Sequence, residues 1–264
     1  MTRVPWWLWS IATFVILTFW MFAAAVVTGT LTAIGPSGVG WFDLLTELAT
    51  FVPFALATLF AWRVLLRRPL RSLITNRRHI EFNRIGRGFA TWFGLCAASS
   101  VIDAVLFPDS YTLTFEAGRF VAFALVLLVL LPVQTSSEEL FFRGWILQWA
   151  AALPAVSRVF ISGLVFALPH AGNPEAATDT LLALTAYFLL GAGWAWVSVR
   201  DGGIELALGA HLANNAFSLL VVGYDDAALP TAAIFGTSAL NLTSTTIAIA
   251  VMVPMFARLT RRKH

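Results

Sequence analysis

The chain has 264 residues, of which 59% are hydrophobic and 12% are charged, and its formal net charge is +3 at pH 7. A soluble domain usually carries about 25% charged residues, so this composition excludes an ordinary water-soluble protein. It also argues against a nucleic-acid-binding protein, because the basic residues lie between apolar stretches and not on a surface interleaved with aromatic rings. The expected partner is the lipid bilayer.

The first half of the chain contains four apolar stretches that match a membrane span. A bilayer core of about 30 Å needs about 20 residues of helix, and the candidates are residues 6–27, 44–66, 89–106 and 120–133. The first could also be a signal peptide, since Arg3 precedes it and Ala23 to Ala25 resemble a cleavage site. Its length favours a spanning helix. Cys96, the single cysteine, lies within the third stretch and is expected to be a packing residue.

The second half adds four more candidate spans, residues 159–169, 181–199, 204–222 and 234–257. The sequence therefore predicts an all-α polytopic bundle of about eight transmembrane helices, forming a single integral membrane domain over residues 1–264. Between the fourth and fifth spans, residues 134–151 continue a helical pattern. The fourth helix is therefore expected to be long, or to break near Pro132.

The arginines predict the orientation of the bundle, because cytoplasmic loops of membrane proteins are enriched in Arg and Lys. The connection between the second and third spans carries Arg63, Arg67, Arg68, Arg71, Arg77, Arg78, Arg84 and Arg87. Alternation through eight spans places on the same side Arg3 and the tail residues Arg258, Arg261, Arg262 and Lys263. Both termini are thus expected in the cytoplasm.

The loops predicted on the opposite side carry acidic residues, namely Asp43, Asp109, Glu116, Glu175, Asp179, Asp225 and Asp226. This charge asymmetry supports the same orientation. The chain contains a single Lys, and with its abundant Ala this is typical of a GC-rich bacterial genome. We therefore expect a multi-pass protein of a bacterial plasma membrane.

Ionisable side chains inside a membrane cost about 2.5–3.5 kcal/mol each at a helix centre, so each is a functional candidate. The first group is Glu138, Glu139 and Arg143. Helical spacing places Glu139 and Arg143 one turn apart on one face, where they can pair, while Glu138 points about 100° away. One carboxylate is therefore expected to be paired and the other free for chemistry, although an ion pair that only locks two helices would need the same residues.

Two further polar groups follow on later helical segments. Phe166 and His170 lie four residues apart at the end of one span, and His211 and Asn215 lie four apart on another, with Asn214 beside them. Each group alone has a structural interpretation: a capped, hydrogen-bonded histidine for the first, and polar contacts between helices for the second.

The three groups together, Glu-Glu-x-x-x-Arg, Phe-x-x-x-His and His-x-x-x-Asn on successive segments, resemble the signature of the CPBP (CAAX protease and bacteriocin-processing) family. The prenyl-protein endopeptidases also belong to this family of intramembrane endopeptidases. The motif core covers residues 136–216, under a third of the chain, and outside it the resemblance rests on hydropathy alone.

The resemblance implies an endopeptidase that acts on a membrane-bound or lipidated peptide or protein. Glu138 would be the general base, His170 would orient the water, and His211 and Asn215 would stabilise the oxyanion. The supporting residues would be Glu139, Arg143, Phe166 and Asn214. Peptide hydrolysis needs an activated water, a proton carrier and oxyanion donors, and these residue types supply all three. Sequence does not choose between prenylated and other membrane-anchored substrates.

A zinc site is the alternative use of the same residues. Glu138, His170 and His211 could form a two-His, one-carboxylate site with an open position for water. The metal-free glutamate mechanism is favoured, because no His-Glu-x-x-His motif is present.

Two other functions would use the same cavity. A proton- or cation-coupled transporter would relay charge through Glu138, His170 and His211, and a non-catalytic binding protein would capture membrane partners. No inverted repeats with broken helices favour the transporter. The remaining carboxylates, Asp103 and Glu205, fall near predicted span ends, where we expect them to reach the interface.

Overall fold

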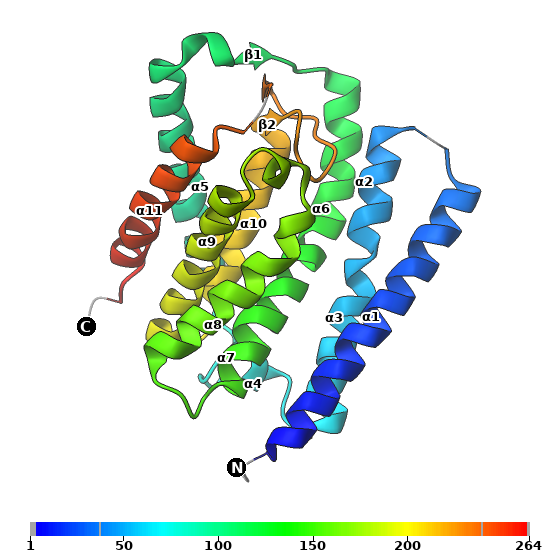
Figure 1. Cartoon of the computed structure of the whole chain (residues 1–264), viewed down its shortest axis with the longest axis vertical. Coiled ribbons are helices and arrows are strands. Elements are labelled where there is room, and N and C mark those ends of the chain that lie inside the picture. Colours follow the sequence, from blue (N-terminus) through cyan, green and yellow to red (C-terminus); the bar gives the residue numbers. More distant parts are fainter. Residues whose placement is uncertain (1–3, 37, 239, 263–264) are drawn as a thin grey trace.

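The computed structural model describes residues 4–36, 38–238 and 240–262; Arg3 and Lys263, used above as orientation signals, lie outside them. The first part of the bundle consists of α1 (Trp6–Ile34), α2 (Gly40–Ala49) and α3 (Phe51–Phe60), which continues as a π-helical turn, η1 (Ala61–Leu65). α4 (Arg71–Ile74) is a single turn, and α5 (Phe82–Leu106) follows it. These helices run side by side with the rest of the bundle (Figure 1).

The second part begins after the short turn η2 (Pro108–Ser110) and strand β1 (Thr112–Leu113). Its helices are α6 (Ala117–Glu139), α7 (Ile146–Trp149), α8 (Ala155–Ala167), α9 (Thr180–Asp201), α10 (Glu205–Leu220) and α11 (Leu242–Leu259). A π-helical turn, η3 (Leu140–Trp145), joins α6 to α7, and two 3₁₀ turns, η4 (Leu168–Gly172) and η5 (Pro174–Ala177), follow α8. Strands β2 (Val222–Tyr224) and β3 (Phe235–Thr237) lie between α10 and α11.

The predicted all-α polytopic bundle is confirmed. Among the described residues, seven helical segments are long and apolar enough to cross a membrane. The seventh predicted span, residues 204–222, corresponds to α10, whose 16 residues make it shorter than these seven segments. α10 packs against α5, α6 and α9, so neighbouring helices surround this short helix.

The fourth predicted helix is long and does not break at Pro132. α6 passes through Pro132 to Glu139 and continues through η3 and α7, so that residues 117–149 form one segment. The irregularity falls instead at η3, immediately after the two glutamates. π-helical turns inside α-helices are frequent at functional sites.

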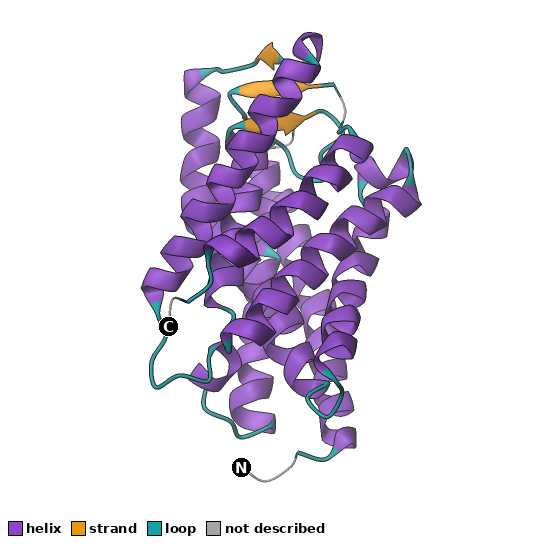
Figure 2. Ribbon diagram, turned by 90° about the vertical axis from the view of Figure 1, so that its left-hand side faces the viewer, coloured by secondary structure: helices purple, strands orange, loops and turns teal. Residues whose placement is uncertain are grey.

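The last predicted span, residues 234–257, begins too early. Phe235–Thr237 form β3, which pairs antiparallel with β1 and parallel with β2 at one end of the bundle (Figure 2). The helix starts only after Asn241, whose side chain accepts a hydrogen bond from the Ser244 amide at 3.0 Å. Hydropathy does not distinguish a short apolar strand from the first turn of a helix, which explains the error.

Helices α5 and α10 pack closely against each other. A methyl group added at Gly209 would lie 2.0 Å from the carbonyl oxygen of Ile85, and one added at Gly88 would lie 2.3 Å from that of Leu206. Small residues let helix backbones approach closely in membranes. This contact fixes α10, which carries His211, against α5.

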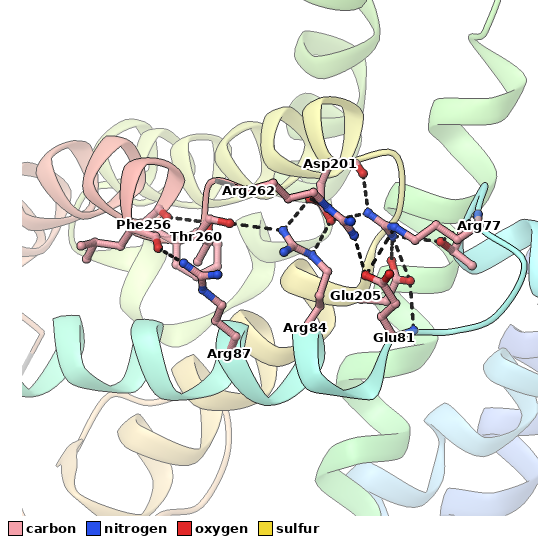
Figure 3. Close-up of polar contacts among 11 residues, drawn as sticks. Arg77, Glu81, Arg84, Arg87, Asp201, Glu205, Phe256, Thr260 and Arg262 are labelled. Atoms are coloured by element: carbon pink, nitrogen blue, oxygen red, sulfur yellow. Dashed lines mark hydrogen bonds and ion pairs between the residues drawn. The ribbon is translucent and has the colours of Figure 1, made fainter. Parts of the chain in front are cut away.

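The arginine-rich connection ends in an ion-pair network (Figure 3). Asp201, at the end of α9, pairs with Arg77 at 2.8 Å and Arg84 at 2.5 Å. Glu205 pairs with Arg77 at 3.0 Å and is fully buried. Glu205 lies at the first residue of α10, near a span end as expected, and its buried carboxylate is paired with Arg77. Its role in this arrangement is structural.

Asp103 also has partners within the protein. Its two carboxylate oxygens accept hydrogen bonds from the Tyr111 hydroxyl at 2.8 Å and the Ser244 hydroxyl at 2.5 Å. Asp103 therefore ties the end of α5 to the start of α11.

Candidate active site

All four predicted catalytic residues line one cavity of about 1180 Å³. Glu138 comes from the end of α6, His170 from η4, and His211 and Asn215 from α10. Phe166 and Asn214, two of the predicted supporting residues, line the same cavity. Segments separated by more than seventy residues in the sequence are therefore brought to a single point.

Glu139 and Arg143 form the predicted pair. An Arg143 guanidinium nitrogen lies 2.9 Å from a Glu139 oxygen, and neither side chain is exposed. The two groups are close but not aligned for a hydrogen bond. The guanidinium also lies 4.2 Å from the centre of the Phe166 ring and 5.4 Å from that of Trp194, so that cation–π contacts compensate part of its desolvation.

Glu139 has a second partner that the sequence did not predict. Its Oε1 lies 2.8 Å from Nδ1 of His211, whose Nε2 lies 3.5 Å from Oε2 of Glu138. A carboxylate paired with arginine can only accept, so Nδ1 of His211 carries the proton. Glu139 thus orients His211 so that its Nε2 faces Glu138.

The orientation of His170 is fixed in the same way. Its Nδ1 lies 2.8 Å from the carbonyl oxygen of Phe166, and a carbonyl only accepts, so Nδ1 carries the proton and Nε2 keeps its lone pair. The ring stacks on Tyr187 with centroids 3.9 Å apart. Phe166 contacts both histidines, with ring centroids 4.8 Å from His170 and 5.9 Å from His211.

A chain of hydrogen bonds orients the two asparagines. Trp92 Nε1 donates to Asn214 Oδ1 at 3.2 Å, Asn214 Nδ2 donates to Asn215 Oδ1 at 3.2 Å, and Asn215 Nδ2 donates to Gln134 Oε1 at 3.1 Å. An amide nitrogen has two N–H groups. Asn215 therefore retains one donor for a ligand in the cavity.

Several residues of the site were not predicted from the sequence. Gln134 carries a detectable signal, because it is a polar residue one turn before Glu138 in an apolar helix. Trp92, Trp194 and Tyr187 carry none, since aromatic residues are common throughout the chain. Glu175 was grouped with the acidic loop residues, but it is only 1% exposed and lines the cavity.

The alternative zinc site, with Glu138, His170 and His211 as ligands, stays a prediction. Among the residues that the structure describes, no group of three His, Cys, Asp or Glu side chains is gathered closely enough to hold a metal ion. The chemistry proposed below uses only groups of the chain itself.

Residues 119–217 match the family model described as type II CAAX prenyl endopeptidase Rce1-like. The predicted family resemblance is confirmed. This Rce1-like segment contains every residue of the three motifs and runs from α6 to α10. The cavity described above is therefore built largely from the part of the chain that matches the family.

A curated relative extends the match outside the motifs. The chain is 39% identical over 166 residues to the uncharacterized protein YyaK of Bacillus subtilis (strain 168). The aligned region covers 61% of this chain and 55% of that protein. The chain thus spans about half the length of the relative. No solved structure matches the chain. The apolar helices and the Rce1-like segment identify a multi-pass membrane protein.

Proposed function

We propose that this protein is an intramembrane endopeptidase of a bacterial plasma membrane, which hydrolyses a peptide bond in a membrane-bound or lipidated peptide or protein. The observation that carries the proposal is the arrangement of Glu138 and His211, whose Oε2 and Nε2 atoms lie 3.5 Å apart in the wall of the cavity. A carboxylate and a fixed imidazole within the helices of a membrane protein form a site for activating water.

Glu138 is the proposed general base. It removes a proton from a water molecule that donates its other hydrogen to the Nε2 lone pair of His170. The water oxygen attacks the carbonyl carbon of the scissile peptide. As the C–N bond breaks, Glu138 returns the proton to the leaving nitrogen, so that the products are a carboxylic acid and an amine. His170 orients the water and does not change its own protonation.

The developing oxyanion has two proposed donors. Asn215 offers the N–H group that Gln134 does not use, and the second is the ring of His211, whose Nδ1 is held by Glu139 and whose Nε2 faces Glu138. Such preorganised donors are typically worth about 10²–10³-fold in rate each. Glu139, Arg143, Phe166 and Asn214 position these groups through the contacts described above.

The test is cleavage of a panel of membrane-anchored and prenylated peptides by purified protein, comparing the wild type with Glu138→Gln. We expect the variant to lose at least 10²-fold in turnover and to keep substrate binding. Glu116→Gln, in an exposed loop, is the matched control and should cleave normally. Cleavage that persists in Glu138→Gln would overturn the assignment of the base.

The metal-free mechanism is tested in the same assay with a chelator. We propose that chelation leaves the wild-type rate unchanged, because Glu138 activates water without a Lewis acid. Loss of cleavage on chelation, restored by zinc, would contradict this mechanism while leaving the endopeptidase activity established.

A further inference from the structure

The cavity has four carboxylates in its wall, Glu47, Asp103, Glu138 and Glu175, and the described residues contribute no Lys or Arg to it. A cavity with low-dielectric walls and charges of one sign concentrates the opposite charge. Which of these carboxylates can bind a ligand depends on the hydrogen-bond partners that each already has within the protein.

Glu175 differs from the other three because one of its carboxylate oxygens is buried without a hydrogen-bond partner. Its Oε1 accepts hydrogen bonds from the Tyr187 hydroxyl and from Asn173 Nδ2. Its Oε2 is buried and has no hydrogen-bond partner, although the residue is only 1% exposed. A buried polar atom without a hydrogen-bond partner costs free energy. Because Glu175 lines the cavity, a donor group of a bound ligand would remove this cost.

Glu175 is also close to the proposed reaction centre. Tyr187, which donates to it, stacks on His170 with ring centroids 3.9 Å apart. The Tyr187 side chain contacts both the carboxylate and the imidazole, and the length of one tyrosine side chain corresponds to about two residues of an extended peptide. A side chain bound at Glu175 would therefore belong to a residue next to the scissile bond or one further along.

The surroundings of Glu175 favour a cation. Tyr224, in β2, lines the same cavity, and burial, together with the charges of Glu175 and Asp226, raises the pKa of its hydroxyl. The phenol therefore stays neutral. Two tyrosine side chains and a carboxylate form a wall that suits an ammonium or guanidinium group, which can pair with the carboxylate and contact the rings.

We propose that Glu175 is the specificity-determining residue of a subsite that binds a Lys or Arg side chain of the substrate close to the scissile bond. The proposal rests on the endopeptidase function and names a feature of its substrate: a basic residue within about two positions of the cleaved bond. A purely structural role for Glu175 accounts for the contacts of Oε1 with Tyr187 and Asn173, but leaves Oε2 unexplained.

The test uses membrane-anchored peptides in which one Lys is moved through the segment that is cleaved, with norleucine at the same position as the uncharged counterpart. We expect the wild type to cleave the Lys peptide at least tenfold faster at one position. Glu175→Gln keeps an acceptor for Tyr187 and should reduce this preference to within twofold. Glu116→Gln should keep the full preference.

Two results would overturn the subsite: no preference in the wild type, or an unchanged preference in Glu175→Gln. Glu175→Asp, which keeps the charge, should retain a preference of at least threefold if Glu175→Gln does not fold. Binding of fluorescent Lys and norleucine peptides to Glu138→Gln gives a readout that does not need turnover, and equal Kd values there would also overturn the proposal. Cleavage persisting in Glu138→Gln contradicts the proposed base alone.

Discussion

Glu139 contacts two other residues of the motifs, Arg143 and His211. The spacing in the sequence predicts its pair with Arg143, and the structure shows that the same carboxylate oxygen also holds Nδ1 of His211 at 2.8 Å. One buried carboxylate therefore joins the π-helical turn after α6 to α10. Through His211, it also directs Nε2 toward Glu138.

Arg143→Leu should be strongly destabilising for this reason. Removing one partner of a buried ion pair leaves an uncompensated charge and typically costs about 3–5 kcal/mol. We expect the free energy of unfolding in detergent to fall by about this amount, measured by denaturant titration. Arg63→Leu, at an exposed position on the lipid- or solvent-facing side of η1, is the control and should change it by less than about 0.5 kcal/mol. Equal effects of the two substitutions would contradict the importance of the pair.

The motif residues could be predicted from sequence because their spacing is helical and because ionisable residues are rare in apolar segments. Their partners could not. Trp92 contacts Asn214 from a position 122 residues away, and nothing local to Trp92 indicates this. Glu175 lies in a loop, as predicted, but hydropathy does not show that this loop, η5, lines the cavity.

The elements show which local signals decide the fold. Pro132 does not break α6, whereas the irregular turn η3 follows the two glutamates without a proline or glycine at its start. The strands were missed because three residues of Val222–Tyr224 or Phe235–Thr237 are too few for a periodicity to be recognised. Tertiary pairing with β1, more than a hundred residues away, defines β3.

The α5–α10 contact gives a prediction at this scale. Gly209→Ala would place a methyl group 2.0 Å from the Ile85 carbonyl oxygen, so the two helices must separate. We expect a loss of about 1–3 kcal/mol in the free energy of unfolding. Gly94→Ala, on α5, meets no atom within 4 Å and should be neutral or slightly stabilising. Thermal unfolding of both variants in detergent measures the difference, and equal midpoints would show that the contact can relax.

The two ends of the bundle differ in structure and in charge. The arginine network links the start of α5, the α9–α10 turn and the end of α11 (Figure 3), whereas the short sheet lies at the other end of the bundle (Figure 2). The start of α1 lies at the lower end of the view in Figure 1, as α4 does. The positive-inside rule predicts that this arginine-rich end faces the cytoplasm.

The orientation is tested with short tags fused to the two termini. In intact cells with a permeable outer layer, an added protease should leave both tags uncut, and it should remove both after the plasma membrane is opened. A tag cut in intact cells would contradict the predicted topology. A tag inserted after Glu116 in the opposite loop is the internal control and should be cut in both conditions.

The single cysteine gives this cavity a reporter of its own. Cys96 is on α5 and lines the cavity beside the candidate site, and the chain has no second thiol to react. A small uncharged alkylating reagent that enters the cavity therefore has this sulfur as its single thiol target. A peptide that fills the cavity shields it, so the alkylation rate of the unmodified protein measures occupancy even for a substrate that is never cleaved.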